Sequence, residues 1–176
     1  MPSTDNPLLQ WSRPTLLEYL RDQDIAFEEA IHPAVFTMAE SAALDIDLAG
    51  QRCKNLLVRN KKGKQDFLVV TGPDAGIDLA ALAQALGTGR LSLCPPARMQ
   101  ALLGVAPGAL SPLALVADTA PQPVRLLMDE SLRANPRFLF HPLVNTSTIC
   151  LNGESLHKFL ESTGHCAEYL SIPTTR

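Results

Sequence analysis

The stretch that decides the fold is KNLLVRNKKGKQDFLVV, residues 54–70. Two runs of strand-forming residues, 56–60 and 67–70, flank the tetrapeptide KKGK at 61–64. Because glycine permits the backbone of a tight turn, the stretch predicts a β-hairpin. The stretch is rich in basic side chains, and no acidic residue occurs between Gln51 and Asp66 to balance them. The hairpin is therefore either a solvated surface feature or a contact site for an anionic ligand.

The whole chain is acidic, which narrows the possible partners of this basic stretch. It has 176 residues, a net charge of −3, 46% hydrophobic and 19% charged residues. These values predict one globular domain spanning residues 1–176. A net negative charge disfavours binding along DNA or long RNA, which requires many phosphate contacts. It leaves open a local patch that binds one end of an RNA.

Membrane and export signals are absent from the sequence. No apolar run approaches the roughly 18–20 residues of a spanning helix, and the N-terminal residues lack the pattern of a secretory signal. We therefore expect a cytoplasmic protein without a membrane partner.

The remaining hydrophobic pattern indicates an α+β fold. Helices are predicted where apolar periodicity coincides with capping residues, at 13–24, 37–46, 78–87, 95–104 and 152–164. Strands are predicted at 25–30, 55–60, 66–70, 113–118, 124–129, 137–140 and 146–151. Since the two types do not alternate regularly, the pattern disfavours a doubly wound parallel sheet. We expect a mixed, largely antiparallel sheet or partial barrel with helices packed around it.

The four cysteines give no sign of a metal or redox site. Cys53, Cys94, Cys150 and Cys166 are far apart and form no C-x-x-C pair. Zinc and redox motifs use closer pairs, so reduced and partly buried thiols are expected. No paired-histidine zinc motif occurs either. We predict no metal and no cofactor.

Three short segments could carry chemistry, and each also has a purely structural interpretation. Lys54-Asn55 begins the hairpin; its lysine is either solvated or holds a phosphate as a compact charge. PGALSPLALV, residues 107–116, is either an ordinary turn into a strand or a turn that presents backbone N–H groups to a carbonyl oxygen. Alone, neither signal is specific.

The third segment is FHPLVNT, residues 140–146. Pro142 biases His141 toward an extended backbone, and Asn145 could orient a ring nitrogen or a water. The histidine is either structural or a group that positions water. No G-x-S-x-G nucleophile, catalytic cysteine context or phosphate-binding glycine loop is present. An enzyme with this sequence would work by positioning its substrate.

Together, in this order, the segments resemble the YbaK/ProX family of aminoacyl-tRNA editing domains. The resemblance also includes HPAVFTMAES at 32–41 and the C-terminal NGESLHKFLESTG at 152–164. Within the family, the sequence is most similar to free-standing prolyl-tRNA editing proteins. This resemblance implies hydrolysis, in trans, of the ester that joins a wrong amino acid to the 3′-terminal adenosine of tRNA(Pro), with alanine as the expected amino acid.

The resemblance also implies residue roles. Lys54 would grip phosphate or ribose, Gly108 would hold the substrate carbonyl through its backbone, and His141 would shape the pocket or help place water. Further substrate-binding positions are Asn55, Ala109, Ser111, Pro112 and Asn145. The substrate's own 2′-OH would assist the attack, and prolyl-tRNA synthetase is a possible partner.

Two alternatives remain at this point. The preferred substrate could carry cysteine or serine instead of alanine. Alternatively, the chain could be a non-catalytic module that binds tRNA or a protein partner. Retention of Lys54, Gly108 and His141 favours an enzyme.

Overall fold

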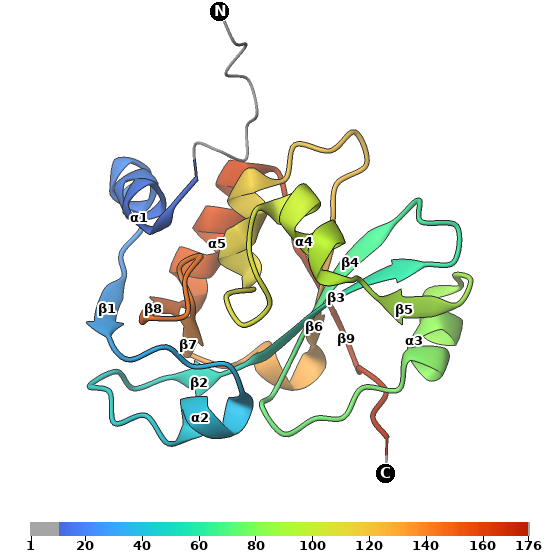
Figure 1. The fold of residues 1–176 in the computed structure, drawn as a ribbon, viewed down its shortest axis with the longest axis horizontal. Coiled ribbons are helices and arrows are strands. Elements are labelled where there is room, and N and C mark those ends of the chain that lie inside the picture. The colour runs from blue at the N-terminus through green and yellow to red at the C-terminus, as the bar shows by residue number, and fades with distance from the viewer. Residues whose placement is uncertain (1–10, 176) are drawn as a thin grey trace, which may run out of the picture.

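In a computed structural model that describes residues 11–175, the strands form two sheets (Figure 1). The first sheet has the order β1-β8-β7-β2 and the second β5-β3-β4-β6-β9. The first contains β1 (Glu28–Ile31), β8 (Ser147–Asn152), β7 (Arg137–Phe140) and β2 (Gln51–Arg52). The second contains β5 (Leu91–Leu93), β3 (Lys54–Asn60), β4 (Asp66–Thr71), β6 (Arg125–Asp129) and β9 (Ala167–Leu170).

The predicted hairpin forms the centre of the second sheet. β3 and β4 pair antiparallel, and Gly63 in their connection adopts a φ of 60°, a conformation that glycine reaches without steric cost. β4 is buried along its whole length because β6 covers its other edge in parallel. Because a strand that is enclosed on both edges and both faces buries every side chain, its sequence is a continuous apolar run, as at 67–70.

All five predicted helices form, because the capping residues are local signals, although the helix predicted at 37–46 already ends at Ala42. The helices are α1 (Arg13–Asp22), α2 (Met38–Ala42), α3 (Leu79–Leu86), α4 (Pro96–Leu103) and α5 (Gly153–Thr163). The predicted capping box opens α2, where Thr37 Oγ1 accepts from Glu40 N at 3.1 Å. Gly87, Gly104 and Gly164 end their helices in the left-handed conformation. None of the described helices is long and apolar enough to cross a bilayer.

The core lies between the sheets and the helices. The larger buried cluster joins α1, α4 and α5 to the first sheet and one face of the second. A smaller cluster joins α3 to the opposite face of the second sheet, around Phe67 and Leu82. Figure 1 accordingly shows α3 beside β5, on the far side of β3 from α5.

The strand predicted at 113–118 is wrong. This segment is a 3-10 helix, η2 (Pro112–Ala117), that packs against α4 and α5. Ser111 caps it by accepting from Leu113 N at 3.2 Å, and Pro112 occupies its first turn. A short apolar run buried on all sides has no periodicity that separates strand from helix.

The α+β prediction is confirmed, but the sheet is divided in two and does not close into a barrel within residues 11–175.

The sequence analysis missed three short strands: β2, β5 and β9. The chain does not end on the last helix, because β9 adds to the second sheet beside β6. Another short 3-10 helix, η3 (Glu130–Leu132), follows β6.

Candidate functional site

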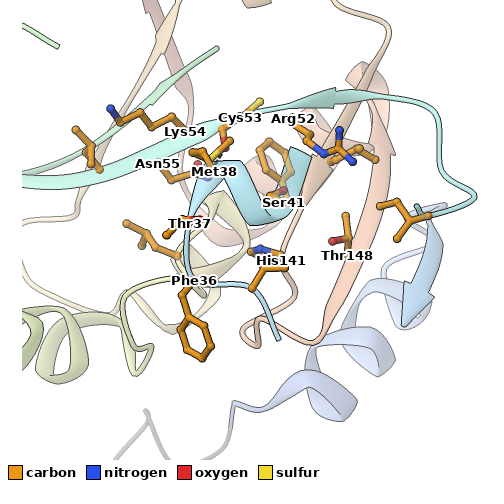
Figure 2. Close-up of a pocket in the computed structure, with 17 residues that line it drawn as sticks. Phe36, Thr37, Met38, Ser41, Arg52, Cys53, Lys54, Asn55, His141 and Thr148 are labelled. Atoms are coloured by element: carbon orange, nitrogen blue, oxygen red, sulfur yellow. Dashed lines mark hydrogen bonds between the residues drawn. The ribbon is translucent and has the colours of Figure 1, made fainter. Parts of the chain in front are cut away.

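A change of sheet between Arg52 and Lys54 creates the site. β2 ends at Arg52 in the first sheet, and β3 begins at Lys54 in the second, with the buried Cys53 between them. The chain therefore bends where the two sheets separate, and the residues at the bend face a cavity of about 250 Å³. Figure 2 shows side chains from α2, the β2–β3 junction and the end of β7 around it.

The cavity combines an apolar lining with a few polar groups. Its apolar residues are Val35, Phe36, Met38, Ile46, Cys53, Leu56, Leu110, Leu139 and Phe140. Its other residues are Thr37, Ser41, Arg52, Lys54, Asn55, Gly108, His141 and Thr148. Four predicted site residues, Lys54, Asn55, Gly108 and His141, therefore meet in one cavity although they come from three distant segments.

The charge in the cavity is positive. Lys54 Nζ donates to the Ala75 carbonyl at 3.0 Å, and Arg52 Nη2 donates to the Leu44 carbonyl at 3.3 Å. Neither cation pairs with a carboxylate within residues 11–175, and no aspartate or glutamate lines the cavity. Two cations held only by neutral oxygens leave unbalanced charge for an anionic ligand.

Asn55 contributes an unsatisfied acceptor. Its Oδ1 is buried and has no hydrogen-bond partner among the described residues, while its Nδ2 makes only a long contact of 3.5 Å to the Cys53 carbonyl. A buried acceptor without a donor costs about 1–3 kcal/mol. Such an atom at a cavity wall is suited to a ligand that brings a hydrogen-bond donor.

His141 is held as a neutral imidazole. Nδ1–H donates to the Ser147 carbonyl at 2.8 Å, and Nε2 has no partner in the part of the chain that the structure describes. Burial, with repulsion from His32, lowers the pKa of His141 below its ordinary value of 6.5, against the opposing effect of the Ser147 hydrogen bond. The remaining lone pair on Nε2 can accept a hydrogen bond from water or substrate.

A second histidine orients a hydroxyl of the cavity. His32 Nδ1–H donates to the Pro33 carbonyl at 2.8 Å, and its Nε2 lies 2.8 Å from Thr148 Oγ1. The hydrogen bond between His32 Nε2 and the Thr148 hydroxyl holds that hydroxyl in place. The rings of His32 and His141 lie close, with centroids 5.8 Å apart.

Gly108 adopts a conformation that favours glycine, with φ of 91°. A Cβ built there would lie 3.7 Å from the Val35 carbonyl oxygen and 4.0 Å from Phe36 Cα. Space is therefore sufficient, and backbone conformation is what disfavours another residue. The exposed glycine lets a ligand approach the backbone closely.

Four predicted binding residues lie outside the cavity lining. Ala109, Ser111 and Pro112 are buried behind Gly108, where Ser111 Oγ donates to the His141 carbonyl at 2.8 Å. Asn145 Nδ2 donates to the Val35 carbonyl at 2.8 Å, so it joins the His141 loop to the segment before α2. The contacts of Ser111 and Asn145 position the cavity walls.

Cys53 lines the cavity, but its thiol is a poor nucleophile. Burial raises the pKa of the thiol to about 12, so the thiolate nucleophile is scarce at neutral pH. All four cysteines are free, and no group of three or more His, Cys, Asp or Glu side chains within residues 11–175 is arranged to hold a metal.

Sequence reasoning missed Arg52, Thr148 and Phe36 as residues of the cavity. Arg52 stands two positions before Lys54, which was a usable signal. Phe36 lies in the segment 32–41 that the resemblance included, but nothing there singled it out. Thr148 carried no signal, because its exposure to the cavity depends on how β8 and the segment before α2 meet.

Comparisons with known proteins identify the family. The aminoacyl-tRNA editing domain matches residues 32–159, a range that includes every residue lining the cavity. The chain belongs to the aminoacyl-tRNA editing domain family. Members of this family are deacylases, so the chain is a hydrolase, as the sequence predicted.

Relatives extend the family match over most of the chain. The prolyl-tRNA editing protein ProX of Acetoanaerobium sticklandii is 33% identical over 141 residues, covering 80% of this chain and 85% of ProX. Prolyl-tRNA synthetase associated domain-containing protein 1 of Xenopus laevis is 35% identical over 157 residues, covering 87% and 92%. A crystal structure of a protein proposed to be a trans-editing enzyme for prolyl-tRNA synthetase aligns with a TM-score of 0.66, covering 98% of this chain and 100% of that chain at 20% identity. That likeness supports the fold.

Proposed function

We propose that this protein is a trans-editing deacylase that hydrolyses the ester of mischarged tRNA(Pro), with Ala-tRNA(Pro) as its main substrate. The observation that carries the proposal is the convergence of Lys54, Asn55, Gly108 and His141 on one cavity that has unbalanced positive charge. An aminoacyl-tRNA end offers a phosphate for the cation, an ester carbonyl for the backbone of Gly108 and a small side chain for the apolar walls.

The size of the cavity fits an aminoacyl group. At about 250 Å³ it lies slightly below the range of roughly 300–1,000 Å³ typical of small-molecule sites. A synthetase pocket built for proline cannot strongly reject alanine, because each missing methylene is worth only about 1–3 kcal/mol. A second, smaller pocket that admits alanine and rejects proline supplies the missing discrimination as a double sieve.

Three of the four hydroxyl and thiol groups that line the cavity, all except Ser41, support a mechanism without a protein nucleophile. Thr37 caps α2, Thr148 contacts His32, and Cys53 is held as a thiol. In the proposed reaction, the neutral His141 accepts a hydrogen bond from the attacking water, and the 2′-OH of the terminal ribose assists the attack. Lys54 binds phosphate or ribose, and Gly108 N–H stabilises the oxyanion.

A deacylation panel tests the proposal. Purified protein is incubated with Ala-, Cys-, Ser- and Pro-charged tRNA(Pro), without added metal or nucleotide. We expect rapid hydrolysis of Ala-tRNA(Pro) and none of Pro-tRNA(Pro). Faster hydrolysis of Cys-tRNA(Pro) or Ser-tRNA(Pro) would identify that ester, instead of the alanyl ester, as the main substrate. Intact tRNA binding without any hydrolysis would support the non-catalytic module instead.

A further inference from the structure

Phe36 stands out among the apolar residues of the cavity because its side chain is not buried. It is 72% exposed, the highest value among the large exposed hydrophobic residues. Its ring makes no aromatic or cation contact within residues 11–175. Figure 2 shows the ring turned away from the labelled side chains that surround the cavity. Packing inside the protein therefore does not explain this aromatic residue.

The backbone that carries Phe36 is fixed on several sides. Phe36 N donates to Glu40 Oε2 at 2.6 Å, within the cap of α2. The preceding Val35 exchanges two hydrogen bonds with Asn145, one from its N–H at 3.2 Å and one to its carbonyl at 2.8 Å. An exposed ring on a constrained backbone is a preformed contact surface, because little main-chain freedom is lost on binding.

Phe36 also lies next to the residue assigned to the ester carbonyl. The Cβ position of Gly108 is 4.0 Å from Phe36 Cα, so the two backbones are neighbours at the mouth of the cavity. If the aminoacyl ester lies over Gly108, the ribose that carries the ester stands at this mouth. The nearest base is then the terminal adenine itself, outside the cavity and on the side of the exposed ring.

We propose that Phe36 is the stacking platform for the 3′-terminal adenine of the bound tRNA. This inference rests on the proposed function, since it takes the ester position from it. Single-stranded RNA ends are recognised largely by stacking of unpaired bases on aromatic side chains. Stacking would place the base outside the aminoacyl cavity and leave the cavity free to select the amino acid.

Binding experiments test the platform independently of hydrolysis. The probe is deacylated tRNA(Pro) with 2-aminopurine in place of the terminal adenine, whose fluorescence is quenched when the base stacks; affinity is followed separately by the anisotropy of a 5′ label. We expect the wild type to bind and to quench the probe. Phe36→Ala should weaken binding by about 5- to 150-fold and abolish the quenching.

Matched variants separate stacking from general hydrophobicity. Phe36→Trp should restore affinity and quenching, whereas Phe36→Leu should restore neither. Ile31→Ala and Leu93→Ala remove other exposed apolar side chains, 67% and 56% exposed, that do not line the cavity, and both should bind as the wild type does. In hydrolysis, Phe36→Ala should raise KM and leave kcat nearly unchanged.

The outcomes distinguish the two proposals. Wild-type binding and quenching that persist in Phe36→Ala would overturn the platform while leaving the editing function intact. A wild type that neither binds nor deacylates tRNA(Pro) would overturn both proposals.

Discussion

The polar clusters around His141 and His165 are built in opposite ways. His165 is fully paired: Nδ1 contacts Thr163 Oγ1 and Nε2 donates to Asp118 Oδ2, both at 2.8 Å. In the cluster around His141, the His141 Nε2 and the Asn55 Oδ1 have no hydrogen-bond partner in residues 11–175, and Lys54 and Arg52 have carbonyl partners but no carboxylate. Satisfied polar groups stabilise a fold, whereas unsatisfied ones at a cavity are available to a ligand.

The His165 cluster should therefore govern stability. The side chains of His165 and Asp118 are only 3% and 0% exposed. Burial alone would raise the pKa of Asp118. Hydrogen bonds from His165 and from the backbone N–H groups of Val124 and Ala120 outweigh burial and lower this pKa. The stability linked to this carboxylate is present above its unfolded pKa of about 3.9 and is lost as pH falls through the folded value.

The largest expected effect is on the free energy of unfolding of His165→Ala. Removal of one partner from a buried pair leaves the Asp118 carboxylate undercompensated, and should cost about 3–5 kcal/mol in urea unfolding at pH 7. The control is His157→Ala, whose pair with Glu161 is exposed at 3.8 Å and should contribute less than about 1 kcal/mol. Equal losses for the two variants would contradict the comparison.

Lys54→Ala should have the next largest effect, and on activity instead of stability. Loss of a charge-assisted contact to phosphate is worth about 1.5–3 kcal/mol, or roughly 10- to 150-fold in kcat/KM for deacylation. The free energy of unfolding should change little, because the only hydrogen bond of Lys54 Nζ within residues 11–175 is to the Ala75 carbonyl. Lys61→Ala, at the exposed hairpin tip, is the matched charge control and should retain most activity. A Lys54→Ala rate equal to that of the wild type would disprove the phosphate assignment.

The pH profile of kcat/KM should show a smaller effect. Because the pKa of His141 lies below 6.5, the neutral imidazole persists in mildly acidic solution. At pH 6 the wild type should keep a larger fraction of its pH 7.5 rate than the roughly one quarter that a group with the ordinary pKa of 6.5 would keep in its neutral form. An acid limb centred at or above pH 6.5 would be inconsistent with a buried neutral His141 acting on water.

Cys53→Ala should have the smallest effect on deacylation. A thiol with a pKa of about 12 supplies no nucleophile, so we expect less than about a threefold change in kcat, with a modest loss of stability from the buried site. The exposed Cys166 provides the control variant Cys166→Ala. A loss of 100-fold or more with an intact fold would make Cys53 a catalytic residue.

The elements that the sequence predicted correctly are those with local causes. Capping boxes, terminal glycines and the Gly63 turn act within a few residues, so α2, α5 and the β3–β4 hairpin were predictable. The segment at 112–117 was not, since its apolar run fits either a strand or a buried helix. The short strands β2 and β9 owe their pairing to partners that lie far away in sequence, β7 and β6.

The same division holds for the site. The sequence by itself determined that Lys54 begins a strand, that position 108 is a glycine free to adopt a positive φ, and that His141 precedes a proline, because these are properties of single residues and their neighbours. Only the tertiary structure decided that these positions face one cavity, that Ser111 and Asn145 support its walls, and that Arg52, Thr148 and Phe36 belong to it. The physical reason is the bend at Cys53: two sheets separate there, and which side chains face the gap depends on long-range strand pairing.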